Sequence, residues 1–455
     1  MRSIPSIEQL RQREAMRPLE ARYGRAALIE ALRAEAEAVR ARTAAGELTS
    51  DVVGAIEQAV PGRLARAAAP SLRAVINATG VIIHTNLGRA PLGPGAASRV
   101  AELAAGYTNL EYDLATGARG RRDVHAERLI CQLTGAAAAV VVNNNAAATL
   151  LTLAALAAGR EVLISRGELV EIGGGFRVPD VMAQSGAILR EVGTTNRTRV
   201  ADYAAAISDR TALILRVHPS NFRIEGFVER PTAADLAALA RKFSIPLAED
   251  LGSGYLEPLP AVAGLREEPL VSQSLSAGVD LVMFSGDKLL GGPQSGIVAG
   301  ADPLVTLVKR HPLMRALRVD KMTYAALEAT LEHYAAGRAV SDVPVLRMMT
   351  LTAAEIGPRA EKVADSLGKS GFNTSVIDGE STIGGGSAPG ASLPTRLIAL
   401  VHPALTADDL GARLRALDPP IIARIEEGRV VLDLRTVLPQ LDDAVITLIA
   451  GLAPQ

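Results

Sequence analysis

The residue whose surroundings best suit it to chemistry is Lys288, in the run SGDKLLGGPQSG. The segment before it, DLVMFS, is a short apolar run of the kind that forms a buried strand. We therefore expect the strand to end at Ser285 and the lysine to follow in a glycine-rich turn. A lysine held there is partly desolvated, which lowers its pKa and favours imine chemistry. The alternative is an ordinary surface lysine after a strand.

Two other segments supply partners for such a lysine. Asp250 ends the run IPLAED, 38 residues earlier (288 − 250), and a buried carboxylate there would keep a pyridine nitrogen protonated. The run NNNAAATLL follows AAVVV and opens a helix, so the backbone N–H groups of Asn145, Ala146 and Ala147 can face an anion. By itself this turn reads more simply as an Asn-capped helix start. The three segments together predict pyridoxal 5'-phosphate, bound to Lys288 as a Schiff base.

The elements that must position these residues form an α/β pattern. Short apolar runs alternate with helical stretches rich in Ala and Leu, as in a mostly parallel sheet with ligands at the carboxyl ends of its strands. The predicted strands are AAVVVN, EVLISR, AILREV, TALILRV, IPLAED and DLVMFS. A second α/β unit follows, with predicted strands FNTSVI, RLIALV, PIIARIEE and RVVLDL. The Gly- and Pro-rich segment STIGGGSAPGASLPT is predicted to be a mobile loop.

The pattern divides the chain into four parts. We predict a helical N-terminal domain over residues 1–62, a linker over 63–84, a cofactor-binding large domain over 85–338 and a smaller α/β domain over 339–455. In the first part, Gly46 ends one helix and Thr49-Ser50-Asp51 begins another.

Composition narrows the function classes. The 455 residues carry a net charge of -1, so a polyanionic partner must bind at a local basic patch. Residues 1–73 contain twelve Arg and nine acidic residues, which also suits a solvated helical bundle. The single cysteine, Cys131, excludes an intrachain disulfide, and the absence of CxxC and HExxH spacings predicts no metal site. Without an apolar leader or membrane-length run, a soluble cytoplasmic protein is expected.

Longer stretches of the chain resemble the bacterial selenocysteine synthases, the L-seryl-tRNA(Sec) selenium transferases of PLP fold type I. The resemblance covers nearly the whole length. Besides AEDLGSG and FSGDKLLGGPQSG, it is carried by VINATGVIIHTNLGRAPL, YTNLEYDLATGARGRRDVHAE, RGELVEIGGGFRVPDVM, VGTTNRT and HPLMRALRVDKMT.

This resemblance implies a reaction. Serine esterified to tRNA would displace Lys288, lose its Cα proton and β-hydroxyl to give a PLP-bound aminoacrylyl group, and accept selenium from selenophosphate. It also implies roles for single residues. Asp287 would assist proton transfer or departure of the hydroxyl, Asn221 would contact the cofactor's phenolic oxygen, and Ser285 its phosphate. Arg89, Arg315 and Arg318 would bind selenophosphate.

The same resemblance implies that the N-terminal helices bind tRNA. It further implies a homo-oligomer, a decamer built as a pentamer of dimers, with active sites at subunit interfaces. One rival is a PLP lyase or ammonia-lyase acting on a small amino acid or sugar-acid phosphate, which should lack the N-terminal unit. Another is a catalytically silent tRNA-binding or scaffold protein, against which Lys288 and Asp250 argue.

Overall fold

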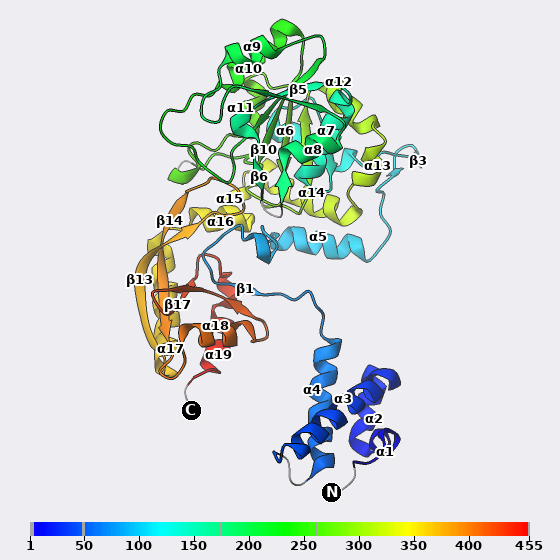
Figure 1. Ribbon diagram of the computed structural model, residues 1–455, viewed down its shortest axis with the longest axis vertical. Coiled ribbons are helices and arrows are strands. Elements are labelled where there is room, and N and C mark those ends of the chain that lie inside the picture. The colour runs from blue at the N-terminus through cyan, green and yellow to red at the C-terminus, as the bar shows by residue number, and fades with distance from the viewer. Residues whose placement is uncertain (1–3, 48–50, 173–174, 260–261, 454–455) are drawn as a thin grey trace. The chain divides into compact units, whose positions relative to one another are not determined.

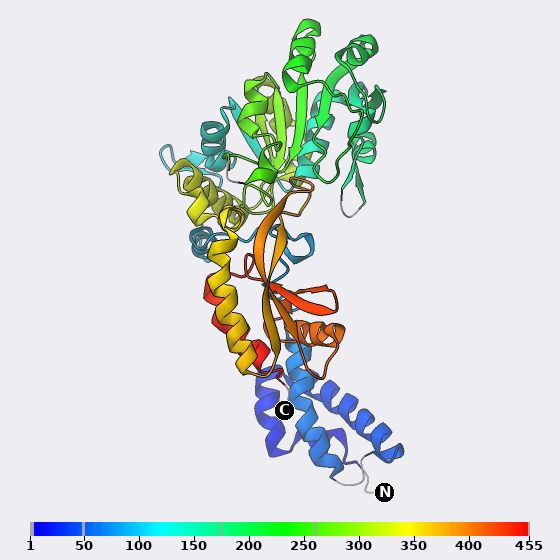
Figure 2. The ribbon, with the colours of Figure 1, turned by 90° about the vertical axis from the view of Figure 1, so that its left-hand side faces the viewer.

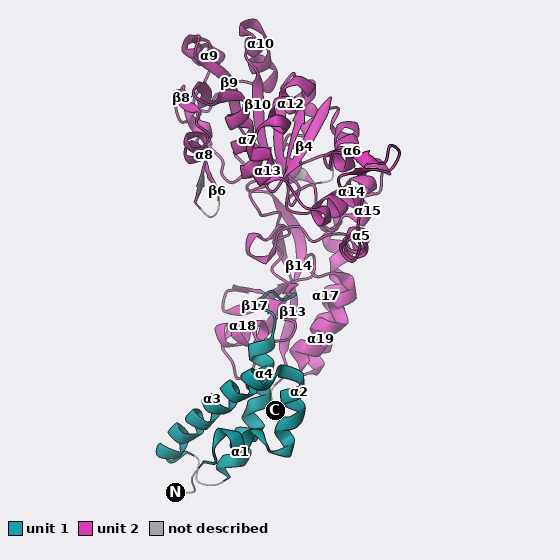
Figure 3. Cartoon of the chain, turned by 90° about the vertical axis from the view of Figure 1, so that its right-hand side faces the viewer, with its two compact units in different colours: residues 1–74 teal, residues 75–455 magenta. Residues whose placement is uncertain are grey.

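The computed structural model describes residues 4–47, 51–172, 175–259 and 262–453. The chain separates into two compact units, residues 1–74 and 75–455 (Figure 3). Among the described residues, no helix is both long enough and apolar enough to cross a membrane.

The first unit is helical and has its own core. Its elements are α1 (Ile7–Arg11), η1 (Glu14–Met16), α2 (Arg17–Tyr23), α3 (Arg25–Ala44) and α4 (Val52–Ala68). The predicted helix stop is present, since α3 ends two residues before Gly46, which has a φ of 78°. Asp51 caps α4 by accepting a hydrogen bond from the N–H of Gly54 at 3.0 Å. Thr49 and Ser50, the other residues of the predicted start, lie outside the described residues.

The second unit is built on a central sheet surrounded by helices (Figure 1). The sheet has seven strands in the order β4-β12-β11-β10-β9-β5-β8. Its strands are β4 (Ala138–Val142), β5 (Glu161–Ser165), β8 (Ile188–Val192), β9 (Thr211–Val217), β10 (Leu247–Gly252), β11 (Leu281–Ser285) and β12 (Gly296–Gly300). The strand β12 runs antiparallel to both neighbours, and the remaining pairs are parallel. The predicted mostly parallel sheet is therefore confirmed, while β12 was not predicted.

Helices cover both faces of this sheet, because alternate strand residues point to opposite sides. In β4, Ala139 and Val141 join one buried cluster, whereas Val140 and Val142 join another. The helices of this part are α5 (Pro94–Ala104), α6 (Val124–Thr134), α7 (Asn145–Ala157), α8 (Val178–Gln184), α9 (Val200–Ala206), α10 (Ala233–Phe243), α11 (Val271–Ser276), α12 (Asp302–Arg310), α13 (Leu313–Leu317) and α14 (Lys321–Ala335). Short elements connect them: η2 (Thr85–Leu87), β2 (Tyr112–Asp113), β3 (Ala118–Arg119), η3 (Arg166–Glu168), β6 (Glu171–Ile172), β7 (Phe176–Arg177) and η4 (Ala263–Leu265).

A second, antiparallel sheet has the order β13-β14-β17-β16 and packs against α17 (Figure 2). Its strands are β13 (Asn373–Thr382), β14 (Ser392–Val401), β16 (Arg424–Glu426) and β17 (Arg429–Asp433). The helices around it are α15 (Ala339–Asp342), α16 (Pro344–Thr350), α17 (Ala353–Lys369), α18 (Ala407–Arg415), η5 (Pro439–Leu441) and α19 (Asp442–Ala450).

One strand prediction and one loop prediction in this part were wrong in detail. The run PIIARIEE forms two strands instead of one, because β15 (Ile421–Ile422) leaves the sheet to pair with β1 (Ile76–Asn77). The predicted loop STIGGGSAPGASLPT shrinks to residues 383–391, because both of its ends continue the long ribbon of β13 and β14. That shorter loop reaches the site described next.

Candidate active site

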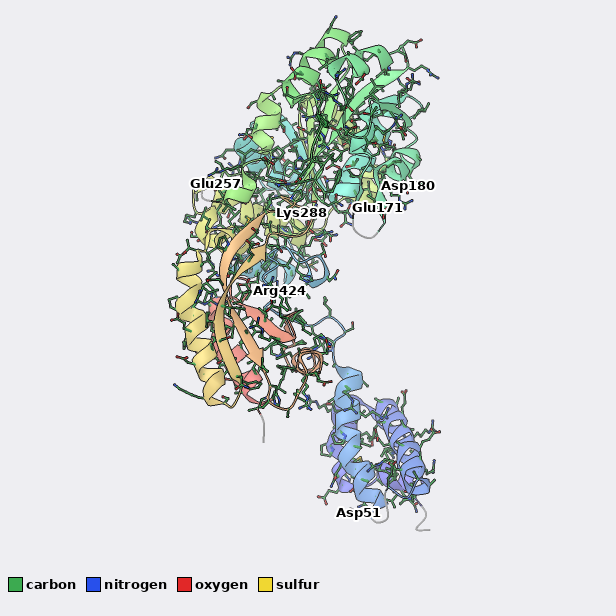
Figure 4. The ribbon with its side chains drawn as sticks, turned by 60° about the vertical axis from the view of Figure 1, so that its left-hand side comes forward. Asp51, Glu171, Asp180, Glu257, Lys288 and Arg424 are labelled. Carbon is green, nitrogen blue, oxygen red and sulfur yellow. The ribbon has the colours of Figure 1, made fainter. Side chains whose placement is uncertain are left out.

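Lys288, labelled in Figure 4, lies three residues beyond β11. The strand β11 pairs in parallel with β10, which carries Asp250. Both side chains are buried, with residue exposures of 6% for Lys288 and 5% for Asp250. Burial lowers the pKa of the Lys288 amine, and the opposite charge of Asp250 partly restores it. The lysine is thus a desolvated amine, as the sequence predicts, and not a surface lysine.

Asp250 is held by two side chains from the first turns of α7. The side-chain amide of Asn145 donates to Oδ1 at 2.7 Å, and the hydroxyl of Thr149 donates to Oδ2 at 3.0 Å. Burial raises the pKa of Asp250, and these two hydrogen bonds oppose that change. Asn145 was expected to offer its backbone, so its side-chain contact is new. Thr149 was missed, although its position four residues after Asn145 places the two side chains on one helix face.

The turn before α7 also shows the simpler arrangement that its sequence suggests. Asn144 is the helix N-cap and accepts a hydrogen bond from the N–H of Ala147 at 2.8 Å. Asn145 and Ala146 occupy the first two positions of the helix, where backbone N–H groups have no intrahelical acceptor. The positive end of α7 therefore lies next to Asp250, with Ala147 already bonded to the cap.

Two glycines border the Lys288 amine. A Cβ at Gly252 would lie 3.7 Å from Lys288 Nζ, and a Cβ at Gly386 would lie 3.8 Å from it. Both glycines have positive φ, 70° and 68°, which disfavours any residue with a side chain. Gly386 belongs to the loop between β13 and β14, so a segment almost a hundred residues later in the chain forms one wall of the site.

Arg89 and Asp287 form an ion pair beside the lysine, with Nη1 and Oδ2 2.7 Å apart. The Asp287 side chain is 6% exposed and that of Arg89 is 36% exposed. After burial, which has the larger effect, the charge of Arg89 also lowers the pKa of Lys288. The pair therefore presents a partly open guanidinium next to the reactive amine.

Arg315 and Arg318 lie elsewhere in this single chain. They line a cavity of about 730 Å³ together with Arg121, Lys309 and other basic residues. Arg318 also lies 3.5 Å from Glu111. Arg89 is not among the residues that line this cavity, so the three arginines predicted to act together occupy two places.

The last two predicted site residues are Asn221 and Ser285. Asn221 is exposed, and its side-chain amide donates to the carbonyl of Glu171 at 2.8 Å. Its Cβ lies 3.9 Å from the point where a Gly386 Cβ would be. Ser285 is buried as the last residue of β11.

The residues present fit pyridoxal 5'-phosphate. The site combines a desolvated amine, a buried carboxylate and the positive end of a helix, which are the groups that the aldehyde, the pyridine nitrogen and the phosphate require. Within the described residues, Asn145 Oδ1 and Ser253 Oγ are buried without a hydrogen-bond partner. Buried polar atoms are rarely left unpaired in proteins, so these two suit contact with a bound molecule.

Comparison with known proteins identifies the family of the chain. The family model of L-seryl-tRNA selenium transferase matches residues 75–438, and the model of the selenocysteine synthase N terminus matches residues 1–40. The chain is 48% identical to an L-seryl-tRNA(Sec) selenium transferase of Geobacter sulfurreducens, over 99% of this chain and 98% of that protein. It is 49% identical to one of Hyphomonas neptunium over 96% of each, and 45% identical to one of Aquifex aeolicus over 96% and 95%.

Among solved structures, a D-glucosaminate-6-phosphate ammonia-lyase shares the fold. The TM-score is 0.59 at 23% identity, covering 84% of this chain and 97% of that one. The chain has the PLP-dependent fold type I and uses pyridoxal 5'-phosphate as cofactor. On the extent of both family matches and the identity to full-length relatives, the chain belongs to the L-seryl-tRNA selenium transferase family.

Proposed function

We propose that this enzyme converts L-seryl-tRNA(Sec) to L-selenocysteinyl-tRNA(Sec), with selenophosphate as the selenium donor. The observation that carries the proposal is the match to both family models, one on the catalytic part and one on residues 1–40. The site supports it, because replacing a β-hydroxyl requires a base at Cα and a place for the resulting electron pair.

The residues of the site divide this work. Pyridoxal 5'-phosphate, when bound, supplies the electron sink. Asp250 lies where it can hold the proton of the pyridine nitrogen, and Asn145 and Thr149 fix its two oxygens. The lowered pKa of Lys288 leaves its amine neutral more readily, so Nζ can accept the Cα proton of the seryl group.

The ion pair of Arg89 and Asp287 serves the β-carbon in this proposal. Asp287 precedes Lys288 directly and can pass a proton from it to the departing hydroxyl, which leaves as water. Arg89 is held by Asp287 with about a third of its side chain exposed, so its guanidinium can bind an oxyanion of selenophosphate. Ser285 and the N-terminus of α7 with Asn145, Ala146 and Ala147 are proposed to bind the cofactor phosphate, the N–H of Ala147 sharing its hydrogen bond with the Asn144 cap. Asn221 is proposed to contact the phenolic oxygen.

Arg315 and Arg318 are proposed to bind selenophosphate across a subunit interface. In one chain they line a cavity whose lining does not include Arg89, and in this proposal a second subunit brings the three together. We therefore propose a homo-oligomer, a decamer of five dimers. The mass of the native particle tests this, and an active monomer would contradict it.

We further propose residues 1–62 as a tRNA-binding domain, 63–84 as a linker, 85–338 as the cofactor domain and 339–455 as the small domain, working in the cytoplasm. Because α4 continues to Ala68, the test removes the whole first compact unit, residues 1–74. This deletion should abolish binding of seryl-tRNA(Sec) while the bound cofactor's visible absorbance persists. Binding by the full chain should weaken with salt, since arginines would contact phosphates. Undiminished binding by the truncated protein would contradict this role.

The decisive assay incubates the purified enzyme with seryl-tRNA(Sec) and selenophosphate and measures selenocysteinyl-tRNA. Parallel reactions contain free serine or D-glucosaminate 6-phosphate in place of the charged tRNA. Product from the charged tRNA alone supports the proposal. Turnover of either small molecule without transfer to tRNA would instead indicate a lyase.

A further inference from the structure

A separate cavity lies beside the lysine site, under the segment that joins β9 to α10. Its volume is about 370 Å³, which is in the range of small-ligand pockets. Its lining residues include His218, Phe222, Arg223, Arg230, Glu268 and Pro389. Two lining residues of this cavity lie close to residues that surround the Lys288 amine. The N–H of His218 donates to the carbonyl of Asp250 at 2.8 Å, and the lining residue Ala388 follows Gly386 by two positions.

Glu268 gives this cavity an unused acceptor. Its side chain is 1% exposed. One oxygen, Oε2, accepts from the N–H of Ala388 and faces Nε2 of His218, both at 3.3 Å. Within the described residues the other oxygen, Oε1, is buried with no hydrogen-bond partner. Leaving a buried carboxylate oxygen unpaired is costly, so the cavity suits a ligand that brings a hydroxyl donor.

The remaining lining residues suit a nucleotide. The side chain of Arg223 is 46% exposed, and that of Glu267, its ion-pair partner among the described residues, is 85% exposed, with Nη2 and Oε2 3.6 Å apart. Such an exposed pair is weak and leaves the cation available for a phosphate. Phe222 is half-buried and offers an aromatic surface on which a base can stack.

We propose that this cavity binds the 3'-terminal nucleoside of the charged tRNA. In this arrangement Glu268 Oε1 accepts a hydrogen bond from the ribose 2'-hydroxyl, and Arg223 faces the terminal phosphodiester. The inference rests on the proposed function. It follows from covalent geometry, because only the ester group separates the serine Cα from the ribose. With Cα at Lys288, the nucleoside must enter space adjoining the amine.

The test is a cycle between Glu268 and the 2'-hydroxyl. Seryl-tRNA(Sec) ending in adenosine is compared with one ending in 2'-deoxyadenosine, and kcat/KM for selenium transfer is measured. In the wild type, loss of the hydroxyl should lower kcat/KM by about tenfold or more, as expected for a hydrogen bond to a charged acceptor. In Glu268→Ala the two substrates should react equally. The exposed neighbour provides the control, since Glu267→Ala should keep the full difference.

Arg223 gives a second test that does not depend on the folding of the Glu268 variant. Arg223→Ala should raise KM for the charged tRNA with kcat unchanged. It should also reduce the slope of log binding constant against log salt concentration by about one. Arg413→Ala, an exposed arginine on α18, is the matched control and should change neither.

The outcomes separate the two proposals. If the wild type transfers no selenium to the all-ribose substrate, the proposed function fails. If it transfers selenium but uses both substrates equally, or if Glu268→Ala keeps the difference, only the cavity assignment fails. An Arg223→Ala enzyme that behaves like Arg413→Ala would also overturn it.

Discussion

Two pairs of buried opposite charges in the second unit differ in how well they are satisfied. Asp433 is fully buried and accepts from Ser381 at 2.6 Å and Thr395 at 3.0 Å. Arg435, 1% exposed, donates to Ser381 and to three backbone carbonyls, those of Met348, Leu351 and Pro394. The pair of Lys288 and Asp250 is nearly as buried, yet no hydrogen bond to the Lys288 amine is present among the described residues.

The difference separates structural charge from functional charge. Desolvating a charge costs several kcal/mol, and only a complete set of partners offsets that cost. Arg435 has such a set and joins the β13–β14 ribbon to the end of α16. Lys288 has instead a lowered pKa, two bordering glycines and unpaired polar atoms nearby. A buried charge short of partners therefore marks the place for a ligand.

The largest effect should come from Lys288→Met, which removes the amine and keeps the side-chain volume. Covalent capture of the cofactor, measured by borohydride reduction and peptide mass, should disappear. Selenium transfer should fall by about 10³-fold or more, because the base at Cα is lost. The free energy of unfolding of the apoenzyme should not fall. A large loss of stability would contradict the contrast drawn above.

Arg435→Met should do the reverse. Removing the arginine leaves Asp433 buried and uncompensated, so the free energy of unfolding should fall by about 3–5 kcal/mol. Denaturant unfolding measures this. Lys362→Met is the control, because its pair with Asp443 is exposed, at 64% and 84%. It should change the unfolding free energy by about 1 kcal/mol at most.

Glu168, in η3 after β5, is a buried charge that has a hydrogen-bond partner but a raised pKa, so it lies between Arg435 and Lys288 in how well it is satisfied. Burial raises its pKa from 4.5 to about 7, although its carboxylate accepts from the N–H of Val217 at 3.1 Å. The pKa of Glu168 is higher in the folded protein than in the unfolded chain. Its contribution to the free energy of unfolding is therefore fully present below pH 4.5 and is lost as the pH rises toward 7. Between pH 4.5 and pH 7, Glu168 should lower the free energy of unfolding of the wild type by about 3 kcal/mol. This decrease should be absent in Glu168→Gln. Parallel pH profiles of the wild type and the variant would contradict this.

The smallest effect should come from Thr149→Val, which deletes one hydrogen bond to Asp250. Cofactor affinity should fall by about tenfold, or roughly 1.4 kcal/mol, with little change in fold. Thr152→Val provides the control on the same helix. The Thr152 hydroxyl is buried without a partner among the described residues, so its removal should leave affinity unchanged. Equal effects of the two variants would show that Asp250 does not use Thr149.

The local pattern of apolar residues predicted most strands of the central sheet. Six strands of the central sheet coincide with apolar runs, and Lys288 follows β11 in a turn as predicted. Asp250 was predicted to end its strand but lies two residues before the end of β10. The strand β12, GIVAG, was missed because glycines at both ends hide its apolar centre. The second half of β13, residues 378–382, was missed because it is largely polar and most of it is not buried.

The site needed long-range contacts that no local pattern contains. Asn145 meets Asp250 across 105 residues, and Thr149 meets it across 101. Gly386 reaches Lys288 only because the ribbon of β13 and β14 is long. The motifs that contain Arg89, Arg315 and Arg318 likewise do not show that Arg89 is absent from the cavity that the other two line.

The buried Asp433 also determines when the lysine pocket can form during synthesis. The loop with Gly386 is carried by a ribbon whose Ser381 and Thr395 are fastened to Asp433, a residue made 145 positions after Lys288 (433 − 288). We expect a nascent chain ending before β17 to leave the amine open to water and to amine-acylating reagents. The complete chain should protect it, and equal labelling of the two would refute this order of assembly.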